Sequence, residues 1–420
     1  MKKRSVWAIL ALLVAALAFA AAGCGGEDEG DGGGEAQQEE GQTVKIVSDL
    51  PLQGSDRPQT EQMVRAIEFY LESVDMKAGD YTLEFESFDD ATAAKGAWDE
   101  AKCAENARTF AGDDSIVSVI GTYNSGCAAI EIPILNEASL AMCSPANTYA
   151  GLTHEAPGTE AGEPDKYFPT GTRNYARVVA SDDNQGRVGA EFMMNELGVT
   201  KVYVLNDKEL YGKGVADAFA ASAEEVGLEV VANEGWDKDA PNYRALMTKI
   251  RDSGADGIYI GGISTNNGGQ LMKDKVSVVG PHNDVQVVVS DGFVISSLFP
   301  ESGGPKNVDG IYGTAPTIPP EQVTGAGKEF IDQFTEAEGG KSIEVYTIYA
   351  AACAQVMVEA IANSDGSRES VVEQMLQVDI EDSVVGPMSF DENGDPREKF
   401  ETIYQAKDGK FAFHDRIAVE

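Results

Sequence analysis

The chain has 420 residues, and its 70 acidic residues outnumber its 32 lysines and arginines, which gives a formal net charge of −38 at pH 7. A phosphate backbone requires a basic face, so this charge excludes nucleic acid as a partner. The length exceeds what one hydrophobic core usually supports, and three histidines without an HExxH or CxxC motif predict neither a metal site nor a cofactor.

The N-terminus predicts export. Residues 1–23 combine basic residues at positions 2–4 with an apolar run and small residues before Cys24, which is the layout of a secretory signal. The sequence AAGC that ends at Cys24 resembles a bacterial lipobox, in which the cysteine is lipidated after cleavage. This predicts a lipid-anchored protein at the outer face of the bacterial cytoplasmic membrane. The alternative is ordinary cleavage followed by free secretion.

Residues 24–42 are interpreted as the lipidated cysteine and a tether. The stretch 25–42 is rich in glycine and acidic residues, and its apolar side chains are no larger than alanine, so it cannot bury enough surface to fold. We expect a flexible tether. Farther along, the longest apolar stretch, 345–358, has 14 residues, fewer than the roughly 20 that span a bilayer.

From residue 43 onward, runs rich in valine and isoleucine alternate with segments of helical period. Strands are predicted at 43–49, 81–88, 116–121, 140–144, 201–207, 228–234, 257–262, 285–291 and 308–314, and helices at 59–74, 98–111, 214–227, 243–254 and 325–339. This alternation predicts an α/β protein with parallel, doubly wound sheets that carry helices on both faces. The runs 386–395 and 399–415 contain Asn-Gly and Asp-Gly pairs, which predict hairpins.

Doubly wound sheets bind ligands at the carboxyl ends of their strands, and two segments stand at such ends. In VIGTYNSG (119–126) a helix is expected to begin near Ser125, where a hydroxyl and free backbone N–H groups suit a carboxylate. The second segment is SPANTYAGLT (144–153). The alternative is that Asn124 and Ser125 only cap the helix, and spacing alone favours this alternative.

Residues 119–153 closely resemble the leucine/isoleucine/valine-binding proteins of bacterial ABC transporters. Further matches are VKIVSDLPLQG (44–54), VYVLNDKELYGKGVADAF (202–219), VVVSDGF (287–293) and VVGPMSFDENGD (384–395), and the resemblance is weaker around ISTNNGGQ (263–270). The resemblance covers nearly all of 43–420. It implies the type I periplasmic-binding-protein fold, in which two doubly wound parallel-sheet lobes are joined by a three-strand hinge and close like a Venus flytrap.

The resemblance also implies lobe boundaries and a function. The N-terminal lobe is expected to comprise 43–176 and 315–384, and the C-terminal lobe 177–314 and 385–420. The implied function is that of an extracytoplasmic solute-binding protein, a monomer and not an enzyme. It would bind an amino acid, branched-chain or related, and deliver it to the permease subunits of an ABC importer.

The ligand's two charges would be held by residues carried over from the resemblance. Ser125 would supply a hydroxyl and a backbone N–H to the ligand carboxylate, and Thr148 a second hydroxyl. The Ala146 carbonyl would accept a hydrogen bond from the ligand ammonium, with Asp291 as its counter-ion. Tyr211 would close over the ligand from the second lobe. A zwitterion taken from water requires both charges to be paired.

Tyr123 and Phe293 are expected to line the pocket for the ligand side chain, with ordinary core or rim packing as the alternative. Two features depart from the family. Arg57 lies in an unusual loop, where it is more readily interpreted as solvated surface than as a contact to an extra ligand acid group. Residues 153–171 look like an insertion.

The resemblance further implies a disulfide between Cys103 and Cys127. Cys143, in an apolar strand, and Cys353, in an Ala-rich helix, are predicted to be buried free thiols. The three histidines, His154, His282 and His414, are predicted to lie at the surface.

Two other functions remain open at this stage. The first is an extracellular sensor with the same fold and pocket, which would pass occupancy to a membrane receptor. The second is a hydrolase with Ser125 or Cys127 as nucleophile, although the chain has no G-x-S-x-G motif.

Overall fold

The computed structural model describes residues 42–419. The predicted signal peptide, the lipidation site at Cys24 and most of the predicted tether therefore lie outside the described residues. No helix in the described part is long and apolar enough to cross a membrane.

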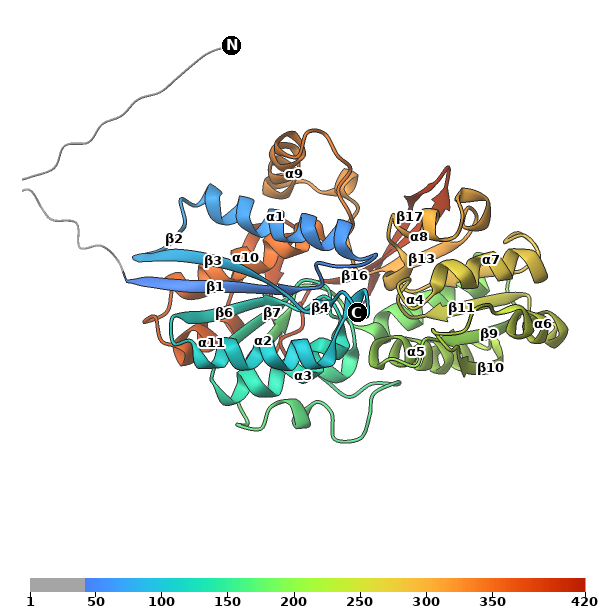
Figure 1. The fold of residues 1–420 in the computed structure, drawn as a ribbon, viewed down its shortest axis with the longest axis horizontal. Coiled ribbons are helices and arrows are strands. Elements are labelled where there is room, and N and C mark those ends of the chain that lie inside the picture. The colour runs from blue at the N-terminus through green and yellow to red at the C-terminus, as the bar shows by residue number, and fades with distance from the viewer. Residues whose placement is uncertain (1–41, 420) are drawn as a thin grey trace, which may run out of the picture. The chain divides into compact units, whose positions relative to one another are not determined.

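Two separate parallel sheets organise the chain (Figure 1). The first has the strand order β2-β3-β1-β6-β7-β8, and all neighbouring strands are parallel except β2, which pairs antiparallel with β3. Its strands are β1 (Thr43–Leu50), β2 (Lys77–Ala78), β3 (Tyr81–Asp89), β6 (Ile116–Gly121), β7 (Ala141–Ser144) and β8 (Tyr175–Arg177). This sheet and the helices packed on it are called the first lobe.

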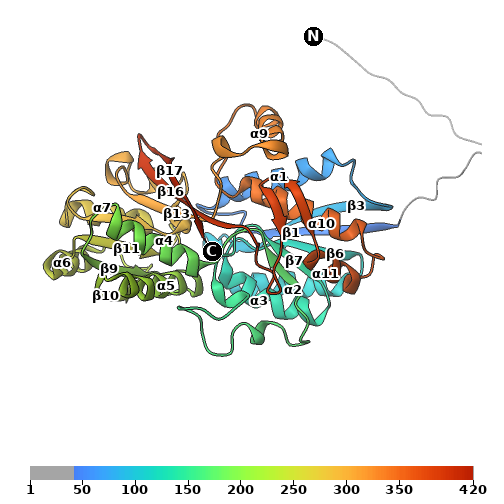
Figure 2. The ribbon, with the colours of Figure 1, turned by 180° about the vertical axis from the view of Figure 1, so that it is seen from behind.

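Helices cover both faces of the first sheet because its central strands are apolar on both sides. In β1, Val44 and Ile46 pack with α1, α10 and α11, whereas Val47 packs with α2 and α3 on the opposite face. The helices are α1 (Arg57–Ser73), α2 (Glu100–Gly112), α3 (Ser125–Glu137), α10 (Thr347–Ala362) and α11 (Arg368–Leu376). A further helix, α9 (Gly325–Ala337), lies beside α1 in both views, where Phe69 and Phe330 meet edge to face at 5.5 Å (Figure 2).

The second sheet has the order β10-β9-β11-β12-β13-β16-β17, and with its helices it forms the second lobe. Strands β10 to β13 are parallel, and the hairpin β16–β17 closes one edge antiparallel. Its strands are β9 (Lys201–Asn206), β10 (Glu229–Gly235), β11 (Gly257–Gly261), β12 (Gln286–Val289), β13 (Tyr312–Ala315), β16 (Lys399–Lys407) and β17 (Lys410–Val419).

The second sheet is also covered on both faces. In β11, Ile258 and Ile260 pack toward α6, α7 and α8, whereas Tyr259 faces α4 and α5 and stacks on Phe219. These helices are α4 (Asp182–Asn195), α5 (Leu210–Val226), α6 (Arg244–Ser253), α7 (Gly268–Val278) and α8 (Leu298–Glu301). The predicted fold class is thereby confirmed as an α/β arrangement of two helix-covered parallel sheets.

The chain passes from one sheet to the other between β8 and α4, between β13 and α9, and between β15 (Gly386–Ser389) and β16. The short hairpin β14 (Asp379–Ser383) with β15 packs beneath α9. The Asp-Gly hairpin predicted at 399–415 is confirmed as β16–β17. Helices α4 and α7 lie in segments for which no helix was predicted, and so does the small hairpin of β4 (Ala91–Thr92) and β5 (Ala97–Trp98).

Two disulfides tie the first lobe. The predicted bond between Cys103 in α2 and Cys127 in α3 is present, with 5.7 Å between the Cα atoms. The prediction of free thiols for the other pair is wrong, because Cys143 in β7 and Cys353 in α10 are bonded. They are 210 positions apart in sequence, with the second lobe between them, so spacing gives no sign that helix and strand pack together.

Peptide mapping without reduction is expected to recover both cysteine pairs as bridged peptides. Removing the first bridge in a Cys103→Ser/Cys127→Ser variant should lower the free energy of unfolding by roughly 3 kcal/mol, because a bond across 24 positions restricts the unfolded chain. Urea denaturation with and without reductant measures this loss. Recovery of Cys103 and Cys127 as free thiols contradicts the pairing.

A buried ionic cluster lies where the chain crosses between lobes. Arg177, at the end of β8, has a fully buried side chain whose Nε lies 2.6 Å from Asp395 Oδ1, in the turn before β16. His154 joins the cluster, with Nδ1 2.9 Å from Asp395 Oδ2 and Nε2 3.4 Å from Asp183 Oδ1 at the start of α4. The cluster therefore connects two of the crossings and the first helix of the second lobe.

Stability is expected to depend on His154 at alkaline pH. Burial lowers the pKa of His154, but its hydrogen bonds with Asp183 and Asp395 outweigh burial and raise the pKa to about 9. A raised folded-state pKa adds stability that is complete below about 6.5 and disappears as the pH rises through 9. Between these values the wild type should lose roughly 1–2 kcal/mol more than His154→Gln in urea titrations. Equal losses contradict this role.

The surface prediction for the histidines is correct only for His414, which is exposed. His154 is partly buried in the ionic cluster. His282 is buried, with Nε2 3.1 Å from the carbonyl oxygen of Asn307, and burial lowers its pKa to about 4. Loop residues were expected to be solvated, but these two loops fold back onto the lobes.

Candidate functional site

A pocket lies between the carboxyl ends of the two sheets, and both lobes contribute side chains to it. It is lined by Trp98, Tyr123, Asn124, Ser125, Gly126, Ala146, Thr148, Glu209, Leu210, Tyr211, Ile263, Asp291, Gly292 and Tyr346. The space open to the centre of a water-sized sphere is about 30 Å³, and the pocket is partly open to solvent. A hinged fold allows the lobes to move apart and admit a ligand.

The first-lobe wall begins at the N-terminus of α3. Strand β6 ends at Gly121, where a Cβ would stand 2.5 Å from the Asp49 carbonyl oxygen, so only glycine permits this approach of β1. Ser125 is the first residue of the helix, and its Oγ lies 3.4 Å from the backbone N of Tyr149. The first turn of a helix leaves N–H groups without partners in the helix, so this end attracts an anion.

The loop after β7 is bound tightly to this wall. Ser144 Oγ donates to the Thr122 carbonyl at 3.0 Å and accepts from the backbone N of Asn147 at 2.9 Å. The Asn147 side chain donates in turn to the carbonyls of Thr122 and Tyr123, each at 3.0 Å. These bonds fix the positions of the loop residues between them. Ala146 and Thr148 therefore stand beside α3 in a rigid setting.

Asp291 supplies a buried carboxylate from the second lobe. It follows β12 and is 6% exposed, so its charge is almost completely removed from water. Its Oδ1 accepts hydrogen bonds from the Tyr211 hydroxyl and, at 2.8 Å, from Gln185 Nε2. Gly292 N donates to the Tyr211 hydroxyl oxygen at 3.2 Å. Tyr211, in the first turn of α5, is thus held against the acid.

The first lobe reaches the same carboxylate through Tyr346, whose hydroxyl donates to Asp291 Oδ2 at 2.7 Å. Tyr346 precedes α10, so this bond connects the two lobes directly. Its ring meets Tyr123 edge to face at 6.0 Å, and the Tyr123 hydroxyl accepts from Gln59 at 2.6 Å. An aromatic wall therefore lies next to the acid.

The pocket is electrostatically acidic. Burial raises the pKa of Asp291, although the hydrogen bonds from Tyr211, Gln185 and Tyr346 act in the opposite direction. Burial, together with the nearby Asp291, also raises the pKa of Asp182 well above its ordinary value. Among residues 42–419 no lysine or arginine lines the pocket, so the carboxylate has no cationic partner there. A ligand ammonium would supply one.

The structure brings most of the predicted site residues together. Six of them line this one pocket: Tyr123, Ser125, Ala146, Thr148, Tyr211 and Asp291. Phe293 does not line it, because its ring is completely buried in the second lobe and meets Trp236 at 6.3 Å. Asp291 and Phe293 belong to one short helical turn, which directs them to opposite sides. The core alternative holds for Phe293.

Other pocket residues were missed. Trp98, Tyr346 and Ile263 stand in segments without a recognisable motif. Gln185, which bonds Asp291 but does not line the pocket, lies in an unpredicted helix. The Glu-Leu pair at 209–210, Gly126 and Gly292 are neighbours in sequence of the predicted residues Tyr211, Ser125 and Asp291. Arg57 is exposed and pairs with Glu61, in agreement with the solvated interpretation.

The segment 153–171 extends from the first lobe, contacts the second, and leads into β8 of the first sheet. Gly158 lies so close to α5 that a Cβ there would stand 2.3 Å from the Gly214 carbonyl oxygen. The Tyr149 hydroxyl donates to buried Glu163 at 2.7 Å and so holds the segment to the loop after β7. This segment therefore forms a second contact between the lobes.

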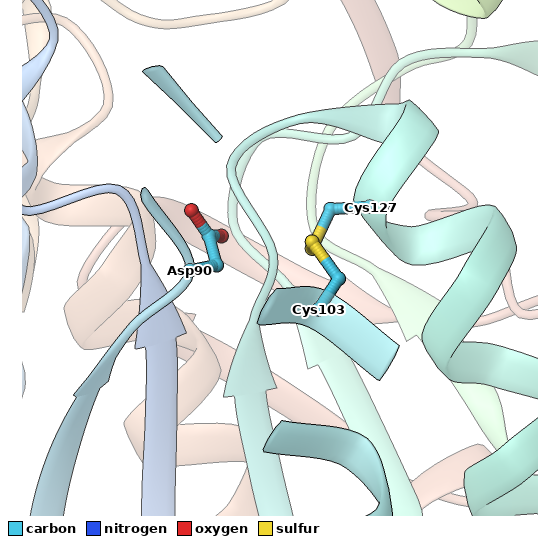
Figure 3. A group of neighbouring side chains, drawn as sticks. All are labelled: Asp90, Cys103 and Cys127. Carbon is cyan, nitrogen blue, oxygen red and sulfur yellow. A yellow bond between two sulfur atoms is a disulfide. The ribbon is translucent and has the colours of Figure 1, made fainter. Parts of the chain in front are cut away.

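One cluster of possible metal ligands lies outside the pocket (Figure 3). Oxygen and sulfur atoms of Asp90, Cys103 and Cys127 lie within 4.8 Å of one another, and all three residues are buried. Both sulfurs are committed to the disulfide, however, so they are not thiolate ligands. The cluster supports no metal centre in this state.

Chemically, the pocket suits a small zwitterion. The N-terminus of α3 with Ser125 can hold a carboxylate, and Asp291 can pair with an ammonium. Buried Thr148 Oγ and Asn124 Oδ1 have no hydrogen-bond partner within residues 42–419, and both residues line the pocket. No histidine of the described chain lines it, so Ser125 has no imidazole base for nucleophilic attack.

Comparison with known proteins identifies the fold and its relatives. A family model described as periplasmic binding protein matches residues 43–410. A protein of Brucella abortus, named Leu/Ile/Val-binding protein homolog 2, is 28% identical over 383 residues, which are 89% of this chain and 94% of the relative.

Two solved structures share the fold. A leucine-binding protein of Thermotoga maritima has a TM-score of 0.76 and 22% identity, with coverage of 89% of this chain and 98% of that one. A branched-chain amino acid transporter substrate-binding protein of Streptococcus pneumoniae, in complex with isoleucine, has a TM-score of 0.75 and 19% identity, with coverage of 90% and 99%. The similarity therefore extends over both lobes.

Proposed function

This chain belongs to the periplasmic binding protein family, and from that premise we propose that it is the solute-binding protein of an ABC importer. It binds an amino acid between its lobes and presents it to permease subunits. Ligand contacts made by both lobes favour the closed state, which is how binding becomes a signal to the permease.

A single observation carries the proposal: one pocket contains both an anion-binding helix N-terminus and a buried carboxylate without a cationic partner. A free amino acid has the matching pair of charges on one carbon atom. In this proposal Ser125 and Thr148 hold the carboxylate, and Ala146 O and Asp291 hold the ammonium. Tyr211 closes over the ligand from the second lobe.

The side chain of the ligand would meet apolar and aromatic groups, namely Tyr123, Leu210, Ile263 and Tyr346. The relative from Brucella abortus is named for leucine, isoleucine and valine, and the Streptococcus pneumoniae structure contains isoleucine. We therefore propose a branched-chain or related amino acid. An aromatic acid without an amine would leave Asp291 unpaired, which disfavours such a ligand.

The remaining features of the proposal concern location and organisation. We propose that lipid on Cys24 anchors a monomer at the outer face of the cytoplasmic membrane, with 24–42 as tether. In this proposal the lobes comprise 43–176 with 315–384 and 177–314 with 385–420. The first two boundaries fall within β8 and β13, and the third falls between β14 and β15. Labelling with a fatty-acid probe should mark the wild type and spare Cys24→Ser.

Calorimetry tests the function. Protein purified, unfolded and refolded to remove any bound ligand should bind at least one of leucine, isoleucine and valine at micromolar concentration or tighter. Absence of binding to all three and to a panel of other amino acids contradicts the proposal. Turnover of an amide or ester that disappears in Ser125→Ala would instead favour a hydrolase, although bonded Cys127 is unavailable as its nucleophile.

A further inference from the structure

A tryptophan of the first lobe stands at the mouth of the pocket. Trp98 ends the small hairpin β4–β5, between the first sheet and α2, and it lines the pocket. Its ring packs against the apolar cluster of the second lobe that contains Tyr211 and Ile263. In exchange, Leu210 of α5 packs against the first-lobe cluster that contains Ile132. Each lobe thus inserts one side chain into the other at this point.

A charged hydrogen bond accompanies this exchange. The Trp98 indole Nε1 donates to Glu209 Oε2 at 3.3 Å, from the first lobe to the second. The other oxygen of Glu209 accepts from Lys238 Nζ at 2.8 Å, which orients the carboxylate. Glu209 lies two residues before Tyr211, so the bond acts on the helix start that also contacts Asp291.

The indole also covers the helix end assigned to the ligand carboxylate. A Cβ on Gly126 would stand 2.6 Å from Trp98 Cη2, so the ring lies directly on the first turn of α3 and requires glycine there. Ser125 is the neighbouring residue. A groove adjoins the pocket, and Trp98, Gly126 and Glu209 line both of them. The indole therefore lies between the pocket and this adjoining groove.

We propose that Trp98 is the lid of the ligand pocket and that its bond with Glu209 controls the rate of ligand release. The inference rests on the proposed function, because it assumes a ligand beside α3. Opening the cleft must break the Trp98–Glu209 bond and withdraw the indole from the second-lobe cluster. Both contacts exist only in the closed state, so breaking them slows ligand release more than it changes ligand entry.

Release is measured by chasing isotopically labelled leucine from the mature protein with excess unlabelled leucine. Glu209→Gln and Trp98→Phe, which weaken or remove the bond, should release leucine about tenfold faster than the wild type. Trp98→Ala, which also removes the ring, should release it at least thirtyfold faster. Glu100→Gln changes a neighbouring exposed acid in the adjoining groove and should stay within twofold. Release rates within twofold of wild type for both Glu209→Gln and Trp98→Ala would contradict the proposal that Trp98 is the lid.

Fluorescence tests the lid without a ligand. Outside the predicted signal peptide the chain has two tryptophans, Trp98 and buried Trp236. Acrylamide quenching of the ligand-free protein should increase about twofold in Glu209→Gln and not in Glu100→Gln, and Trp98→Phe should abolish this difference. Unchanged quenching in Glu209→Gln contradicts the claim that the bond with Glu209 holds the Trp98 ring in place. If the wild type binds no amino acid, the proposed function is contradicted, but the quenching experiment still tests the Trp98–Glu209 bond.

Discussion

Replacing Asp291 with alanine is expected to weaken amino-acid binding by at least a hundredfold, or about 2.7 kcal/mol. The carboxylate is nearly inaccessible to water, and no lysine or arginine lines its pocket within the described chain. In the variant the ligand ammonium would be enclosed in the closed cleft without a counter-charge, which is the costly case for a buried ion. Calorimetry with the tightest-binding amino acid measures the change.

Stability separates this effect from misfolding. Because burial raises the pKa of Asp291, the folded protein gains little from its charge when no ligand is bound. Asp291→Asn keeps the shape and one acceptor oxygen, and its amide nitrogen can donate to the Tyr346 hydroxyl oxygen. It should therefore unfold at the same urea concentration as the wild type while losing the same affinity. Asp239→Ala changes an exposed acid of the second lobe and should bind normally. A loss below tenfold for Asp291→Ala means that Asp291 is not the counter-ion.

Replacing Arg177 with methionine is expected to lower the free energy of unfolding by about 3–5 kcal/mol. The guanidinium is completely buried and bonds Asp395 at 2.6 Å, so its removal leaves a buried carboxylate that only His154 still faces with a charge. The same guanidinium donates to the carbonyl of Tyr149 at 2.9 Å and to that of Asn147 at 3.3 Å. These two residues flank Thr148, so affinity should also decrease.

A double variant tests whether the lost charge pair is the cause. Arg177→Met/Asp395→Asn removes the unpaired acid and should recover about 2 kcal/mol of the loss. Arg187→Met, which breaks a half-exposed pair with Glu191 at 3.8 Å, should cost at most about 0.5 kcal/mol. If the double variant is no more stable than Arg177→Met, the ion pair does not account for the effect.

The fold was largely predictable because its strands are recognisable in the sequence as short apolar runs. Runs such as that of β12 are apolar on both sides, which is typical of a parallel sheet covered twice. The hairpin β4–β5 was not predictable, since each strand has two residues and its Trp98 looks like the start of α2. The pairing of Cys143 with Cys353 depends on how α10 packs, which no local pattern records.

The site was predictable where its residues follow strands. Ser125 and Thr148 stand just after β6 and β7, and Asp291 just after β12, so the rule for doubly wound sheets and the family resemblance both point to them. Tyr346 and Gln185 lie before or within helices and reach Asp291 only through tertiary packing. Closeness in sequence to a site residue did not place Phe293 in the pocket, because the turn that contains Asp291 and Phe293 directs the Phe293 ring into the core.

A crystal structure of the refolded protein with the amino acid selected by calorimetry tests the proposed binding site most directly. The lobes should be closed, with the ligand ammonium within about 3 Å of Asp291 and the ligand carboxylate at the N-terminus of α3, bonded to Ser125. A ligand bound elsewhere, or bound between the lobes with its ammonium away from Asp291, would contradict the proposed site.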